Sequence, residues 1–170
     1  MNLEYRSLLP ENFQPKSRVW VYQSNRLLSL SEALELEESL KDFASSWLSH
    51  GAEVKGWAQL LFGQFLIIMA DESSTAVSGC STDASVRFVK ETGARYGVDF
   101  FNRTNLAFFV KDKIEMLPLS QVEYAWKNGF IKPETLYFNN LVQTRDELEN
   151  NWIIPVENSW LASRLPSAAL

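Results

Sequence analysis

Residues 65–70, FLIIMA, form a continuous apolar run with a polar residue at each end, Gln64 and Asp71. A strand that has one face in solvent alternates apolar and polar side chains, whereas a strand covered on both faces is apolar throughout. The run therefore predicts a central strand of a sheet that is buried on both faces.

Two further strands are expected near this run. Arg18–Gln23, RVWVYQ, alternates and is rich in the β-branched and aromatic residues that strands favour. Val54–Leu61 is also strand-like, and a turn near Phe62 and Gly63 would join it to the apolar run. The sequence thus predicts antiparallel neighbours for the central strand.

Two further extended segments follow along the chain. A short piece at 75–79 either continues the third strand past a bulge or forms a strand of its own. Asn105–Val110, NLAFFV, is a clearer strand, and the turn at Lys111 and Asp112 would pair it with 113–117.

The first helix has the clearest start signal. Ser29 and Glu32 form an S-x-x-E capping box, in which each side chain accepts an N–H from the other residue. Gly51 is a candidate for the residue that ends this helix. Apolar residues repeat at intervals of three and four: Leu36, Leu40, Phe43, Ala44 and Trp47.

A second helix is predicted over residues 82–96. Val86, Val89 and Tyr96 are spaced to lie on one face, and Gly97 can end the helix in a left-handed conformation. From residue 18 to 110 the order of elements is therefore β-α-β-β-α-β.

That order predicts an α+β fold of the ferredoxin-like kind, in which two helices cover one face of an antiparallel sheet. If the piece at 75–79 is a separate strand, three strands in a meander would lead into a helix, as in an RNase H-like α/β fold. We favour the first alternative.

The length of 170 residues suits one domain with its own core. Within it, residues 1–17 are predicted to be an irregular arm, 18–117 the α+β core, and 118–170 short helices and a packed tail. Capping boxes predict two of these helices, and tail tryptophans are expected to pack on the body. The boxes are Ser120 with Glu123 and Thr144 with Glu147, and the tail tryptophans are Trp152 and Trp160.

Charge and residue counts exclude several classes of function. The net charge is −5 without a local cluster of Lys and Arg, so we expect no nucleic-acid partner. No apolar run is long enough to span a bilayer. With one Cys and one His, the chain has no internal disulfide and no Cys-rich or His-pair metal motif, and no cofactor motif is present. A lone thiol favours a cytoplasmic location.

The segment around the only cysteine is the first candidate site. Gly79, Cys80, Ser81, Thr82 and Asp83 are expected at the start of the second helix, where free N–H groups favour an anion or a thiolate. We expect Ser81, Thr82 or Asp83 to cap the helix, and Gly79 to allow close approach of the backbone or an unusual φ.

Asp71 is the second candidate. It follows the most buried strand, and acids at the end of a sheet can hold a divalent metal such as Mg²⁺ for phosphoryl chemistry. The spacing of Asp71 and the neighbouring acids matches no metal motif, and a role in a turn explains Asp71 equally well. We therefore predict no metal site.

The loop 99–103, DFFNR, mixes charged with aromatic residues. It is either a contact surface for a ligand or partner, or its aromatic residues only anchor the loop on the protein.

Three segments, RVWVYQSNR, FLIIMADES with SGCSTDASVRFV, and YGVDFFNR, resemble a small uncharacterised bacterial protein family of about this length. Some of its members carry the label "ABC transporter ATPase". The resemblance spans most of 18–110 and implies no established activity. A P-loop needs G-x-x-x-x-G-K-[ST], and none of the seven glycines stands in that pattern, so the residues do not support the ATPase label.

Two functions remain open. The first is a binding module for a small anionic ligand or a protein partner, suggested by the helix start with small residues and by the many aromatics. The second is a small enzyme that uses Cys80 or a carboxylate and metal site near Asp71. Strands 18–23 and 105–110 are candidate sheet edges, which we expect the C-terminal third or a homodimer to cover.

Overall fold

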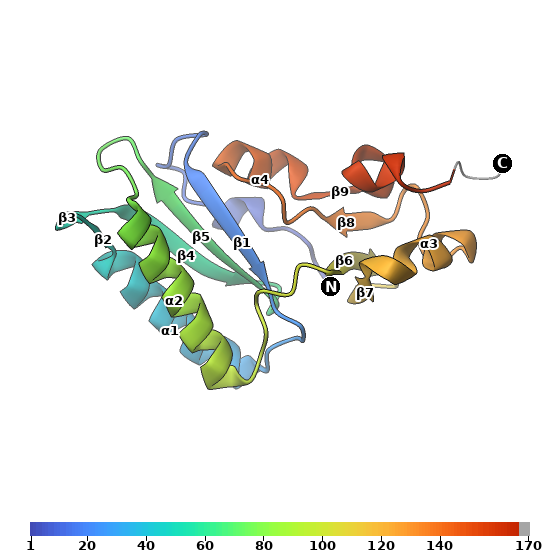
Figure 1. Cartoon of the computed structure of the whole chain (residues 1–170), viewed down its shortest axis with the longest axis horizontal. Helices are drawn as coiled ribbons and strands as arrows, with labels where there is room; N and C mark the ends of the chain where they lie inside the picture. Colours follow the sequence, from blue (N-terminus) through green and yellow to red (C-terminus); the bar gives the residue numbers. More distant parts are fainter. Residues whose placement is uncertain (167–170) are drawn as a thin grey trace.

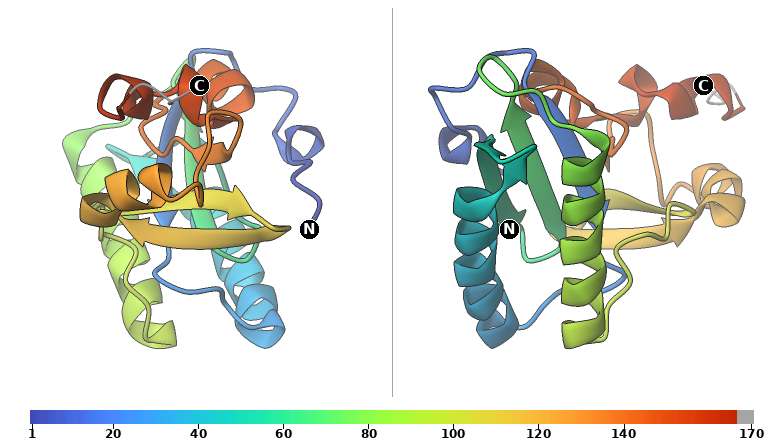
Figure 2. Two further views of the ribbon diagram at one scale, coloured as in Figure 1. Left: turned by 90° about the vertical axis from the view of Figure 1, so that its right-hand side faces the viewer. Right: turned by 60° about the vertical axis from the view of Figure 1, so that its left-hand side comes forward.

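The computed structural model describes residues 1–166 and shows an α+β fold (Figure 1). The end of the predicted tail, 167–170, lies outside the described residues. β1 (Arg18–Gln23), β5 (Phe65–Asp71) and β4 (Lys55–Leu61) form an antiparallel sheet in the order β1-β5-β4. α1 (Leu30–Ser46) and α2 (Gly79–Tyr96) cover one face of this sheet (Figure 2). The predicted fold class is confirmed.

The central strand β5 is buried along its whole length, as its composition predicts. Leu66 and Ile68 face a core that includes Leu36 and Leu40 of α1. Phe65, Ile67 and Met69 face the other way, into a core closed by the N-terminal arm and the C-terminal part of the chain. The residues that close this second core include Tyr5, Phe13, Phe138, Leu148 and Trp152.

A second antiparallel sheet holds the strand expected to complete the first one. Its order is β7 (Lys113–Pro118), β6 (Asn105–Val110), β8 (Leu136–Phe138) and β9 (Ile153–Pro155). The order β1-β5-β4 with both helices on one face matches three strands of a ferredoxin-like unit, but β6 pairs with β7 and β8 instead of β1. The complete ferredoxin-like order, with β6 as the fourth strand of the first sheet, is therefore not confirmed.

No strand forms at 75–79, because Thr75–Ser78 lead directly into α2. The RNase H-like alternative needed that strand and is wrong. The expectation that β6 is an edge strand is also wrong, since β6 lies between β7 and β8. β1 is an edge strand as expected. Residues 143–145 cover its start, where the N–H of Val19 donates to the oxygen of Gln143 and that of Arg145 donates to Ser17.

Most signals of the first two helices are confirmed, with two corrections. Ser29 and Glu32 form both bonds of the capping box at α1. Gly51 does not end α1, because it stands with His50 in the positive-φ turn of a small hairpin, β2 (Leu48–Ser49) and β3 (Ala52–Glu53). α2 starts at Gly79, three residues earlier than predicted, and Gly97 ends it in the left-handed conformation.

The C-terminal third contains more strand than predicted. α3 (Leu119–Lys127) follows Pro118 without a side-chain cap, so the box at Ser120 is wrong. α4 (Arg145–Asn151) is capped by Thr144, which accepts the N–H of Glu147 as expected. The short 3-10 helices of the described chain are Arg6–Leu8, Val156–Asn158 and Trp160–Ser163. In the C-terminal third the sequence did not predict β8 and β9, and earlier in the chain it did not predict β2 and β3.

Candidate functional site

The start of α2 is capped by a residue outside the predicted segment. Ser78 is the N-cap, and its Oγ accepts the N–H of Ser81 at 3.2 Å. The first helical bond runs from the N–H of Thr82 to the oxygen of Ser78. Ser81, Thr82 and Asp83 are therefore not caps, because the helix begins before them.

The five predicted site residues do not share one environment. Ser81 is buried: its Oγ donates to the oxygen of Leu48 at 2.9 Å, and the indole of Trp47 donates to the Ser81 oxygen at 3.0 Å. Gly79 has a negative φ and open space around its Cα, so the predicted close approach or unusual φ is wrong. Cys80 is exposed. Asp83 is exposed and Thr82 half-buried. An anion site over 79–83 stays a prediction.

Asp71 lies at the end of β5 and is almost completely buried. One carboxylate oxygen accepts from Nζ of Lys55 at 2.8 Å and the other accepts the N–H of Ser73 at 3.1 Å. Burial alone would raise the pKa of Asp71, but these hydrogen bonds outweigh it and hold the pKa at about 2. Both oxygens are thus engaged in an ion pair and a turn. Within residues 1–166, no three His, Cys, Asp or Glu residues come together to hold a metal.

A cleft of about 500 Å³ lies beside β1, at the edge where β6 would complete the first sheet. β1 forms one side. The loop between α2 and β6, with Asn102 and Arg103, and the segment 140–144 form others. Aromatic side chains of Phe100, Tyr137 and Trp160 add apolar surface.

The main chain of β1 faces this cleft at alternate residues. The N–H of Val19 points away from β5, because it donates to the oxygen of Gln143 at 2.8 Å. Successive residues of a strand turn their main-chain groups to opposite edges, so Val21 faces outward in the same direction. Among the described residues no strand pairs with this edge at Val21. Its N–H and C=O are available to a ligand.

The charges that line the cleft have one sign. Arg18 and Arg103 are the charged residues among the lining side chains, and no Asp or Glu joins them. The guanidinium of Arg18 stacks on the ring of Trp20, 4.7 Å from its centroid, and lies 3.6 Å from a carboxylate oxygen of Glu72. Arg103 has no ion-pair partner among residues 1–166. The cleft therefore favours an anion although the chain as a whole is acidic.

Tyr22 also lines the cleft with a polar group that has no partner. Its side chain is 6% exposed, and no residue of the described chain forms a hydrogen bond with its hydroxyl. Burial raises the pKa of Tyr22, while the nearby charge of Arg103 lowers it. The phenol is therefore a neutral donor at neutral pH, close to the charge of Arg103.

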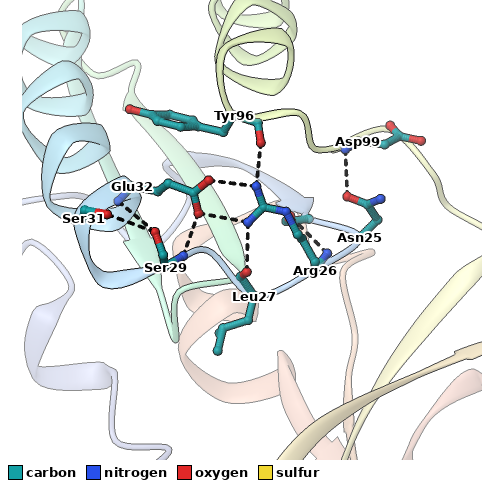
Figure 3. Close-up of polar contacts among 9 residues, drawn as sticks. Asn25, Arg26, Leu27, Ser29, Ser31, Glu32, Tyr96 and Asp99 are labelled. Atoms are coloured by element: carbon teal, nitrogen blue, oxygen red, sulfur yellow. Dashed lines mark hydrogen bonds and ion pairs between the residues drawn. The ribbon is translucent and has the colours of Figure 1, made fainter.

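A network of polar contacts holds the loop that carries Arg103 against the end of β1 (Figure 3). The guanidinium of Arg26 binds both carboxylate oxygens of Glu32, at 2.9 and 2.8 Å, and donates to the oxygen of Tyr96 at 2.5 Å. Next to it, Asn25 Oδ1 accepts the N–H of Asp99 at 2.9 Å. The end of α2 and the start of the loop are thus fixed to the β1–α1 connection.

Both ends of the β1 edge are closed by the chain itself. At one end Val19 is bonded to Gln143. At the other end the amide of Gln23 donates to the oxygen of Asn105 at 3.0 Å and accepts from Asn140 at 2.8 Å. The cleft is therefore a bounded hollow and not an open groove.

Sequence reasoning did not predict this cleft. Two signals were present: the strand 18–23 as a candidate edge, and the loop 99–103 with its mixture of aromatics and charge. The residues that meet at the cleft come from segments over 120 positions apart, and only the departure of β6 into a second sheet opens it.

Comparison of the chain with known protein families, with characterised proteins and with solved structures found no match. In the described part of the chain, none of the helices has the length and apolar character needed to cross a bilayer.

Proposed function

We propose that the protein is a binding module for a small anionic molecule and that the ligand occupies the cleft beside β1. The observation that carries the proposal is the charge of the lining. Among residues 1–166 the lining has two arginines and no carboxylate, in a chain with a net charge of −5. An arginine without an ion-pair partner is well suited to bind a carboxylate or phosphate through two parallel hydrogen bonds.

The size and closure of the cleft support a small ligand. Its volume of about 500 Å³ lies in the range of small-molecule pockets, which combine apolar walls with a few polar groups. A strand from a protein partner needs a continuous open edge. Here Gln143 and the Gln23–Asn140 contact close the edge at both ends, so we favour the small ligand over the protein partner.

Neither residue of the enzyme alternative lines the cleft. Cys80 is exposed at the start of α2, and Asp71 is engaged by Lys55 and Ser73. Binding without chemistry is therefore the function we infer. A cytoplasmic location remains part of the proposal, on the ground that a free thiol persists in a reducing compartment.

The test is a thermal-shift and calorimetric screen of small organic anions, each beside a neutral isostere such as the matching amide. A ligand that binds the folded protein raises its apparent stability by mass action. We expect carboxylates to bind and their neutral isosteres to bind at least about tenfold more weakly, since charge-assisted hydrogen bonds are roughly twice as strong as neutral ones.

The variant Arg103→Gln should lose the preference for anions. Arg87→Gln is the matched control, because Arg87 is an exposed arginine of α2 that does not line the cleft. The proposal is wrong if no anion binds, or if both variants bind anions as the native protein does.

A further inference from the structure

One residue of β1 offers a complete pair of main-chain groups to the cleft. Val19 uses its N–H on Gln143, and the side chain of Gln23 closes the other end. Between them, Val21 is the residue whose N–H and C=O face outward without a strand partner in the described chain. Gln23 turns its main chain to the same edge, but its side chain is bonded to Asn105 and Asn140 at that end. Val21 is therefore the position between the two closed ends.

The groups that complement Val21 follow from strand geometry. In an antiparallel hydrogen-bonded pair, two residues exchange both N–H···O bonds, so each must present its own N–H and its own C=O on the same side. A ligand with an N–H and a carboxyl group on the same carbon meets this condition. Free amines carry a charge that the two arginines would repel, so the nitrogen must be acylated.

The rest of the cleft supplies partners for the other parts of such a ligand. Arg103 and the hydroxyl of Tyr22, which have no ion-pair or hydrogen-bond partner within residues 1–166, suit the second oxygen of a carboxylate. Phe100, Tyr137 and Trp160 provide an aromatic wall for an apolar side chain. The polar contacts of Asn25 and Arg26 hold the Arg103 loop in place before a ligand arrives (Figure 3).

From these observations we infer that the ligand is an N-acylated α-amino acid with an apolar side chain. Its N–H donates to the C=O of Val21, and its carboxylate accepts from the N–H of Val21 and from Arg103. This inference rests on the proposed function, because it identifies the chemical class of the anion that the cleft binds.

Three probes test the N–H contact with Val21 separately from the contacts of the ring and the carboxylate. They are N-acetyl-L-phenylalanine, its N-methylated form, and 3-phenylpropionate. All three have the ring and the carboxylate, but the last two lack the N–H that pairs with Val21. We expect each to bind about tenfold more weakly than N-acetyl-L-phenylalanine by calorimetry, the effect of one hydrogen bond of about 1.4 kcal/mol.

A second measurement locates the contact on the protein. In ¹⁵N-labelled protein, N-acetyl-L-phenylalanine should shift the amide resonance of Val21 and slow the hydrogen exchange of that amide. The main-chain amide of Trp20 faces β5, so its resonance and its exchange rate should change little. Arg103→Gln should weaken all three probes alike, because each has the carboxylate.

The outcomes distinguish the two proposals. Equal affinity for the three probes, or an unchanged Val21 amide, overturns the amino-acid ligand and leaves anion binding standing. No binding of any probe, together with no binding in the screen of other anions, overturns both.

Discussion

Asn25 and Asp99 are joined by two hydrogen bonds across the junction between β1 and the loop that follows α2. The N–H of Asn25 donates to the main-chain oxygen of Asp99 at 3.1 Å, and the N–H of Asp99 donates to Oδ1 of Asn25 at 2.9 Å. The side chain of Asn25 thus fixes Asp99 at the start of the loop (Figure 3). The same loop carries Arg103, which lines the cleft.

The substitution Asn25→Ala should lower the free energy of unfolding by about 1 kcal/mol, because it removes one hydrogen bond to a main-chain N–H. It should also weaken binding of an anionic ligand, since the Arg103 loop loses an anchor. Chemical denaturation and calorimetry measure the two effects. Asn158→Ala is the control, because Asn158 is exposed and makes no side-chain bond in the described chain. Equal effects of the two variants would contradict the anchoring role.

The pair of Arg26 and Glu32 should make stability depend on pH in the acid range. The hydrogen bonds from Arg26 lower the pKa of Glu32 from 4.5 to about 2, with a smaller contribution from the N–H of Ser29. Since the folded pKa lies below the unfolded value, the stabilisation is complete above about pH 4.5 and is lost as the pH falls toward 2.

The variant Arg26→Gln should therefore lose part of this acid dependence, and the carboxyl group of Glu32 should titrate closer to its ordinary value. Unfolding curves between pH 2 and 6 and carboxyl NMR titration test this prediction. Arg87→Gln, which removes an exposed arginine away from Glu32, should leave the titration unchanged. A Glu32 titration that is the same in all three proteins would reject the assigned cause.

Removing Lys55 should leave Asp71 buried without its counter-charge. Lys55→Met is expected to destabilise the protein by about 2 kcal/mol at neutral pH, less than for a fully buried pair because the Lys55 side chain is 37% exposed. The loss should shrink at low pH, where Asp71 takes up a proton. The double variant Lys55→Met with Asp71→Asn should recover much of the stability in denaturant titrations, and a double variant no better than the single one would contradict this.

Two glycines of α2 should respond in opposite ways to the same substitution. A Cβ on Gly93 would lie 2.8 Å from the main-chain oxygen of Val98, so Gly93→Ala should destabilise by about 1–3 kcal/mol. Gly79→Ala is the matched control: nothing lies within 4 Å of its Cβ position, and alanine favours the helix. Thermal unfolding compares them, and equal melting temperatures would show that the close approach at Gly93 relaxes without cost.

The thiol of Cys80 should react with iodoacetamide in the native protein without prior unfolding, because its side chain is exposed at the start of α2. The rate of iodoacetamide reaction in the native protein measures this. A thiol that reacts only after the protein unfolds would contradict this exposed position and remove Cys80 from the candidate nucleophiles.

Local signals in the sequence determined the elements of the first sheet and its helices. The apolar run 65–70 identified the strand that is covered on both faces, and the box at Ser29 with Glu32 identified the start of α1. Hydrophobic periodicity and helix capping depend on residues that are close together in the sequence, so both can be recognised without knowledge of the tertiary structure.

The N-cap of α2 could not be predicted from the local sequence. Ser78, Ser81, Thr82 and Asp83 are all capable caps, and only the path of the chain from β5 selects Ser78. The buried position of Ser81 likewise depends on the β2–β3 hairpin, which the sequence did not predict.

The position and the lining of the cleft beside β1 follow from the tertiary structure alone. The pairing of β6 with β7 and β8 leaves the edge of β1 without a fourth strand, and pairing between distant strands is not encoded in the pattern of either strand by itself. Arg103 and Tyr22 meet there because the contact of Asn25 with Asp99 holds the loop in place. The sequence by itself determined which segments are strands and helices, and the choice of partner strands decided where the chain leaves charged and main-chain groups free to bind.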